Sequence, residues 1–384
     1  MARKPAPGAD LIGASRLALE AVAGVTELVE AVHMNVLGKI GTPAIKPVAG
    51  VTALVYRSVK GVTRLVGGGI DKVLEKLVPV LGEQQGWPGR EALLAAVNGV
   101  LGDRLASSGN PLAIPMRLRH GGEPVVAERA RRRIVVLAHG LCMNDLQWQR
   151  DGVDHGITLE RKRGYTPVYL HYNSGRHVSE NGRELAPQLD ALVATWPVPV
   201  DELVIVGHSM GGLVARSACH YGAASAWLGK LSKMVFLGTP HHGAPLERGG
   251  SWVHMVMDMS AYSAPFARLA RIRSAGITDL RHGSVLEEDW HGHDRFARGN
   301  PLPRFVPVPA GVKCHAVAAT IGKREGDAAD RLLAGDGLVP LASALGQHPD
   351  PERCLSMDSV VLYQTNHMQL LSSPEVEAQL LAWL

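Results

Sequence analysis

Apolar residues recur at every third or fourth position through the first hundred residues of the chain. Between Leu11 and Val32 they fall on one side of a helix, and acidic residues fall on the other. A Gly-Thr-Pro break at 41–43 is followed by a valine face over 48–66. Further helical stretches lie at 70–81 and 91–101. The pattern predicts an N-terminal helical region over residues 1–110.

From residue 111 the pattern changes to short apolar runs that end in loops rich in Gly, His and Asp. Residues 114–119 alternate as in a half-exposed strand. Continuous runs lie at 133–138, 166–172, 202–207, 233–238, 313–318 and 359–364. Such runs are typical of parallel strands covered on both faces, and helical stretches at 180–196 and 210–224 separate them. The sequence therefore predicts an α/β domain over 111–384 with a mostly parallel central sheet.

A serine motif follows one of these strands directly. Gly-His-Ser-Met-Gly at 207–211 stands between the strand at 202–207 and a helical stretch. In this context the small residues allow a sharp turn that lifts the hydroxyl of Ser209 above the strand ends. The Met210 N–H, at the start of the helix, is then placed to stabilise an oxyanion. A second donor is expected from the loop after the strand at 133–138, where Gly140 permits a tight turn and Leu141 follows it. The alternative for Gly140 is a strand-ending turn without a donor role.

A serine nucleophile needs a histidine base and an acid that orients the base. In this type of fold both come later in the chain, the acid before the histidine. Asp336 stands in a glycine-flanked loop after the strand at 313–318, and His367 follows the strand at 359–364. We expect Ser209, Asp336 and His367 to form a catalytic triad. The weaker rivals are Asp327, Asp330 and His348.

The other histidines near these loops admit more ordinary roles. His139 and His242 are candidates for substrate contact, but for His241 and His242 a structural role that braces a loop is the favoured interpretation. A metal site formed by His241, His242 and Asp258 lacks the usual ligand spacing. We therefore expect neither a metal nor another cofactor.

Composition narrows the class of protein further. The 384 residues are 46% hydrophobic, enough for a sizeable core, and the formal net charge is +4. No basic patch interleaved with aromatic residues is present, so we expect no nucleic-acid partner. The cysteines form no CxxC pair, and reduced thiols are expected; they are Cys142, Cys219, Cys314 and Cys354.

The N-terminal sequence bears on the compartment. Its first residues resemble the start of a signal peptide, but Asp10, Arg16 and Glu20 interrupt the apolar stretch that should follow. A cytoplasmic location is expected. A basic stripe in residues 44–66 makes that segment a candidate for peripheral contact with an anionic membrane; it consists of Lys46, Arg57, Lys60 and Arg64. The alternative is a helix that docks on its own enzyme.

Taken together, the motifs resemble those of bacterial lipases and esterases of the α/β-hydrolase superfamily and of the related GPI inositol-deacylase-like group. The resemblance covers about residues 133–384; the motifs begin at His139, Gly207, Gly238, Asp336 and Asn366. It implies the α/β-hydrolase fold, a triad of Ser209, Asp336 and His367, and oxyanion donors at Leu141 and Met210. The chain departs from secreted lipases in its long helical N-terminal region.

The expected activity is hydrolysis of carboxylic esters, with a small-molecule or lipid ester that has an apolar acyl group as substrate. Residues 243–311 form an insertion that we expect to cap the site and shape an acyl pocket; the alternative is a helix packed on the core. Two other functions stay open at this point. The same triad could transfer the acyl group to an alcohol or lipid acceptor, or the protein could bind lipid without catalysis.

Overall fold

The computed structural model describes residues 90–107, 109–110, 112–124, 127–244, 274–292, 302–324 and 335–384. The predicted helices before residue 90, including the basic stripe at 44–66, lie outside these residues. The same holds for most of the expected cap, which is described only at 243–244, 274–292 and 302–311.

An eight-stranded sheet runs through the described part of the chain in the order β2-β1-β4-β3-β5-β6-β7-β8. β1 pairs antiparallel with both β2 and β4, and all other neighbours are parallel. The strands are β1 (Arg117–His120), β2 (Glu123–Pro124), β3 (Arg133–Ala138), β4 (Thr166–His171), β5 (Glu202–His208), β6 (Leu231–Leu237), β7 (Lys313–Ala319) and β8 (Asp358–Leu362). The predicted mostly parallel sheet is confirmed.

The position of the central strands in the sheet explains why their sequences are uniformly apolar. In β3, Val136 pairs with Val168 of β4 on one side and with Ile205 of β5 on the other. All three side chains are buried. Strands at the centre of a parallel sheet are covered by helices on both faces, so neither face tolerates polar residues.

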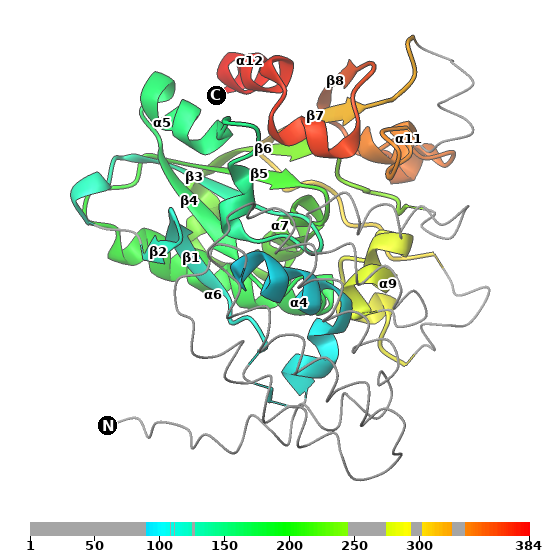
Figure 1. Ribbon diagram of the computed structural model, residues 1–384, viewed down its shortest axis with the longest axis horizontal. Helices are drawn as coiled ribbons and strands as arrows, with labels where there is room; N and C mark the ends of the chain where they lie inside the picture. The colour runs from blue at the N-terminus through cyan, green and yellow to red at the C-terminus, as the bar shows by residue number, and fades with distance from the viewer. Residues whose placement is uncertain are drawn as a thin grey trace, which may run out of the picture.

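Helices cover both faces of this sheet (Figure 1). α5 and α12 lie on one face, and α6 and α7 lie on the other, packed closely against each other. The helices are α4 (Arg90–Ser107), α5 (His155–Arg163), α6 (Val178–Thr195), α7 (Met210–Tyr221), α9 (Ala275–His282), α11 (Leu341–Ala344) and α12 (Pro374–Trp383). Short 3₁₀ turns are η2 (Ala127–Arg129), η3 (Asp145–Trp148), η4 (Ala226–Lys230), η6 (Glu287–Asp289), η7 (Pro351–Arg353) and η8 (His367–Leu371).

The predicted elements agree with these bounds to different degrees. The strand predicted at 133–138 coincides with β3, and the helix predicted at 91–101 continues to Ser107 as α4. α5 and α12 were not predicted. α5 is short and charged, with Asp154 accepting from Ile157 N–H at its start and Gly164 in the left-handed conformation at its end. Its stability therefore comes from capping and from packing on α12 rather than from an apolar stripe.

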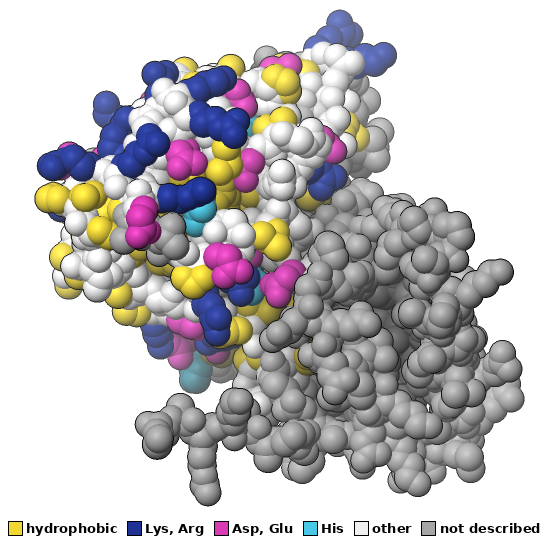
Figure 2. All heavy atoms as spheres, turned by 60° about the vertical axis from the view of Figure 1, so that its left-hand side comes forward, with side chains coloured by type: hydrophobic (Ala, Val, Ile, Leu, Met, Phe, Trp, Pro, Cys, Tyr) yellow, Lys and Arg dark blue, Asp and Glu magenta, His cyan; other side chains and the backbone are white. Residues whose placement is uncertain are grey.

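Charges of both signs are interspersed on the described part of the face in Figure 2. Elsewhere among the described residues, Arg132 is paired with Asp201 and Lys162 with Glu377. Within the described ranges, no helix combines the length and the apolar character needed to cross a bilayer.

The contact between α6 and α7 depends on a missing side chain at Gly182. A Cβ there would lie 2.3 Å from Ser217 Oγ and 2.8 Å from the Ser217 carbonyl carbon. Because one of these atoms belongs to the backbone, the helices themselves would have to separate. Gly182 therefore sets how closely α6 approaches α7.

We expect Gly182→Val to lower the free energy of unfolding by about 3 kcal/mol, because the cost of overpacking outweighs the small gain in helix propensity over glycine. Chemical denaturation of the full chain measures this change. The matched control is Gly229→Val, since a Cβ at Gly229 meets no atom within 4 Å. Equal stabilities of the two variants would contradict the role given to Gly182.

Candidate active site

The three predicted triad residues lie beyond the carboxyl ends of three strands of one sheet. Ser209 follows β5, Asp336 lies in the loop between β7 and α11, and His367 begins η8 after β8. All three are buried. Carboxyl ends of parallel strands meet at one edge of the sheet, where α/β folds hold their ligands.

Ser209 occupies a strained turn between β5 and α7. Its backbone has φ 54° and ψ −122°, values that cost a non-glycine residue on the order of 1–3 kcal/mol. The flanking glycines make the turn sterically feasible. A Cβ at Gly207 would lie 2.5 Å from Gly212 N, and one at Gly211 would lie 2.1 Å from the Ala138 oxygen. The glycines of the G-x-S-x-G motif are therefore needed because the neighbouring backbones approach closely, and the turn they allow presents the serine at the sheet edge.

The loop after β3 lies directly against this turn. A Cβ at Gly140 would be 3.1 Å from Ser209 Cβ, so a larger residue would crowd the serine. Among the described residues, neither Leu141 N–H nor Met210 N–H donates a hydrogen bond to the protein. Two backbone donors near one hydroxyl are suited to binding a negatively charged oxygen.

Asp336 and His367 are in direct contact. His367 Nδ1 lies 2.6 Å from Asp336 Oδ2, and His367 N–H donates to the Asp336 backbone oxygen at 3.1 Å. The other carboxylate oxygen accepts from Leu338 N–H and Val339 N–H. The carboxylate is thus fixed on both oxygens, and it holds the imidazole by one nitrogen.

His367 reaches the serine turn through Gly238. A Cβ at Gly238 would lie 3.1 Å from two atoms of the His367 ring, and the preceding Leu237 oxygen accepts from Ser209 N–H at 2.9 Å. The structure contains no hydrogen bond between the Ser209 hydroxyl and His367. Such bonds are often long in enzymes without substrate and shorten when substrate binds.

His208 contacts both the backbone and the ring of His367. Its Nε2 lies 3.2 Å from the His367 backbone oxygen, and the two rings are 4.7 Å apart. Burial holds the pKa of His208 well below its usual range, so its ring is neutral. A neutral His208 adds no positive charge beside the imidazole of His367.

His139, a candidate for substrate contact, is fully buried within the loop instead of facing open solvent. Its Nδ1 donates to the Gly140 oxygen at 2.8 Å, and its ring stacks on Tyr172 at 4.3 Å. Burial lowers its pKa to about 3. Tyr172 Oη donates to the His139 oxygen at 2.7 Å, so this pair shapes the turn that leads to Leu141.

Sequence reasoning did not foresee that α4 packs on this loop. A Cβ at Gly99 would lie 2.2 Å from Cys142 Sγ and 2.7 Å from Cys142 Cα. Cys142 has φ 58°, and its N–H donates to Ser174 Oγ at 3.0 Å. Glycines spaced along an apolar helix are the signal that predicts a close approach, but they do not identify the partner.

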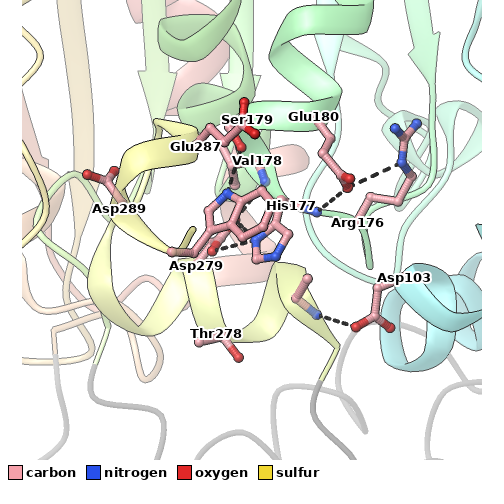
Figure 3. Close-up of polar contacts among 12 residues, drawn as sticks. Asp103, Arg176, His177, Val178, Ser179, Glu180, Thr278, Asp279, Glu287 and Asp289 are labelled. Atoms are coloured by element: carbon pink, nitrogen blue, oxygen red, sulfur yellow. Dashed lines mark hydrogen bonds and ion pairs between the residues drawn. The ribbon is translucent and has the colours of Figure 1, made fainter. Parts of the chain in front are cut away.

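α9, from the expected cap, lies next to α4 and the serine turn. Ser274 Oγ donates to the Gly99 oxygen, and a Cβ at Gly276 would lie 3.1 Å from the Met210 Cε. A second His–Asp pair, in which Asp279 is buried and His177 is half-buried, fixes α9 to the start of α6 (Figure 3). There His177 Nδ1 lies 3.0 Å from Asp279 Oδ2. The Trp290 ring stacks on the His177 ring at 3.7 Å.

His241 and His242 occupy the turn after β6. His242 is half-buried, and its Nε2 donates to the Gly346 oxygen at 3.2 Å. His241 is buried against Arg216 and Phe236. No group of three metal-binding side chains occurs in the part of the chain that the structure describes, which does not include Asp258. The rival acids Asp327 and Asp330 also lie outside it.

The strand order, with the antiparallel strand β1 near one edge and a serine at the turn after the central strand β5, defines the α/β-hydrolase fold. The profile of the PGAP1-like alpha/beta domain family matches residues 130–306. This span contains β3 to β6, the serine turn and α9. Together these features show that the described part of the chain has the α/β-hydrolase fold.

Solved structures with detectable similarity carry related names. A mature-form lipase from Bacillus licheniformis is 16% identical over 70% of this chain and 98% of its own, with a TM-score of 0.42. A lipase-esterase related protein from Clostridium acetobutylicum is 11% identical over 70% and 99%, with a TM-score of 0.40. Naproxen esterase from Bacillus subtilis is 13% identical over 65% and 83%, with a TM-score of 0.38. No curated protein matches the sequence.

The packing of α4 on Cys142 makes a testable prediction. Burial raises the pKa of the Cys142 thiol to about 12, so the folded protein should protect it from alkylation. Gly99→Val would push α4 off the loop, and we expect alkylation of Cys142 to accelerate at least tenfold. Mass spectrometry after brief iodoacetamide treatment measures the rate.

Ala106→Val is the control, because Ala106 lies on the exposed side of the same helix. Equal protection of Cys142 in the two variants would show that α4 does not hold the loop.

Proposed function

We propose that this chain is a serine esterase that hydrolyses carboxylic esters through Ser209, His367 and Asp336. The observation that carries the proposal is the 2.6 Å contact between His367 Nδ1 and Asp336, beside a serine in a strained turn. Asp336 accepts a hydrogen bond from Nδ1–H, which leaves the lone pair of Nε2 available as a base. The match to a PGAP1-like alpha/beta domain supports the same reading.

In the proposed reaction, His367 Nε2 takes the Ser209 proton while the serine oxygen attacks the ester carbonyl. The imidazolium that forms is stabilised by the carboxylate of Asp336, which remains ionised. Negative charge develops on the carbonyl oxygen, and the N–H groups of Leu141 and Met210 bind it. The imidazolium then protonates the departing alcohol, leaving an acyl group on Ser209.

Hydrolysis of this acyl-enzyme completes the cycle. His367 removes a proton from water, the hydroxide attacks the acyl carbon, and the proton returns to the serine oxygen. The same two backbone donors stabilise the second oxyanion. Pre-set donors need no reorganisation during the reaction, which is why a strained but fixed turn is useful here.

For the substrate we propose an ester with an apolar acyl group. Apolar side chains lie around the serine, among them Leu141, Met143 and Met210, and all three are buried. Apolar walls favour an acyl chain over a charged one. Part of the expected cap, α9, already contacts Met210, which supports a role of this insertion in shaping the acyl site.

Ser209→Ala should reduce kcat by about 10⁴- to 10⁶-fold, because no other group can form the acyl-enzyme. A panel of p-nitrophenyl esters from short to long acyl chains measures the loss and the preferred chain length. Circular dichroism should show an unchanged fold. A variant that retained turnover, or a wild-type chain that a fluorophosphonate probe failed to label at Ser209, would exclude this mechanism.

The His367–Asp336 and His177–Asp279 pairs allow a matched comparison. Asp336→Asn should lower kcat by about 10⁴-fold, because an amide no longer selects the His367 tautomer or stabilises its charge. Asp279→Asn removes a carboxylate from the other pair, which lies on α9, and should lower stability with less than tenfold loss of kcat. Steady-state kinetics and thermal denaturation of both variants separate the two effects. Similar losses of kcat would argue against a special role for Asp336.

A further inference from the structure

A cavity beside α7 is lined by three arginines and four histidines and by none of the proposed catalytic residues. It measures about 380 Å³, solvent at its mouth included. Its walls come from α7, the turn after β6, the end of α9 and residues 302–306. The basic side chains that line it are Arg216, Arg304, Arg353, His241, His242, His282 and His348, and no acidic side chain of the described residues does so.

Arg216 is the most unusual of these groups. Its guanidinium is buried, with Nη1 3.3 Å from His241 Nδ1 and Nη2 donating to the Val306 oxygen. Its Nε has no partner within the described residues. Burial lowers the pKa of Arg216 only to about 10, so the group stays charged at neutral pH. A buried charge with neutral partners alone is costly unless an anion lies nearby.

His241 adds an unused donor to the same wall. Because its Nδ1 accepts from the Arg216 guanidinium, its proton must lie on Nε2. That Nε2 has no acceptor among the described residues. Burial holds the pKa of His241 well below its usual range, so the ring is neutral and has only this one N–H. The wall therefore has an excess of donors over acceptors.

The rim of the cavity adds two further arginines, Arg353 and Arg304. Arg353 Nη2 donates to the Pro303 oxygen, and its Nε lacks a partner in the described part of the chain. The Arg304 side chain is exposed at this rim. Two carboxylates lie in the chain beside the rim and hydrogen-bond to backbone: Asp289 accepts from Arg304 N–H, and Asp350 accepts from Glu352 N–H.

We propose that this cavity is a binding site for a phosphate group, either free or as part of a phosphorylated headgroup. A phosphate carries a charge between −1 and −2 at neutral pH and offers several acceptor oxygens to arginine donors. It would supply both the charge and the acceptors that the wall lacks. The site goes beyond the proposed ester hydrolysis and does not depend on it.

The test measures binding of inorganic phosphate to the full chain by isothermal titration calorimetry. The wild-type chain should bind with saturation, and Arg304→Gln should weaken binding about tenfold. This variant removes an exposed side chain and spares the backbone contact of Arg304, so it should fold. Arg161→Gln, an exposed change of equal charge on α5, is the control and should bind as the wild type does.

A second arm distinguishes the two sources of phosphate. Phosphatidylcholine vesicles with and without one-fifth phosphatidic acid are sedimented with the protein. Binding only to the acidic vesicles, reduced by Arg304→Gln and displaced by free phosphate, identifies a headgroup. Phosphate binding without such vesicle binding identifies the free ion, and either result supports the site.

Two outcomes would overturn the proposal. One is the absence of saturable phosphate binding to the wild-type chain, and the other is equal weakening in Arg304→Gln and Arg161→Gln. Ser209→Ala should bind phosphate as the wild type does. Loss of ester hydrolysis and loss of phosphate binding are therefore separable, and either proposal can fail alone.

Discussion

The backbone turn at Ser209 is the constraint around which the described structure is arranged. A residue with a side chain stays at φ 54° only because its surroundings leave no relaxed alternative. The N–H of Ser209 is fixed to Leu237, and the glycines at 207 and 211 let the neighbouring backbones approach. β5, the Ser209 turn and α7 are thus tightly packed together, and the imidazole of His367 lies against Gly238, the residue that follows Leu237.

The loops around that point are held from outside the sheet. α4 lies against Cys142, and α9 lies against both α4 and the residue after the serine. α9 is in turn fixed to α6 by the contact between His177 and the buried Asp279. The loop after β3 is therefore held between the central sheet and two helices from distant parts of the sequence. A site whose donors are pre-set needs such support, since small displacements weaken binding of the developing charge.

Much of the fold could be predicted because the central strands are covered on both faces, which leaves a continuous apolar run such as Ile134–Ala138. Asp336 and His367 could be placed because loops after parallel strands share one edge. α5 escaped prediction since its capping residues, not an apolar stripe, define it. The approach of Gly99 to Cys142 was also beyond reach, because a helical pattern reveals a face and not what covers it. Arg216 reads as an ordinary helix residue until the fold buries it.

The packing of α4 shifts the N-terminal boundary of the α/β domain. The sequence pattern separates a helical region from an α/β domain near residue 110, yet three tight contacts cross that line. They join Gly99 to Cys142, Gly102 to Asn173, and Gly175 to Asn98. A shortened chain that started at the first strand would leave the loop beside the serine facing water on one side. The smallest part of this sequence that keeps the loop beside Ser209 packed therefore includes α4, which begins at Arg90.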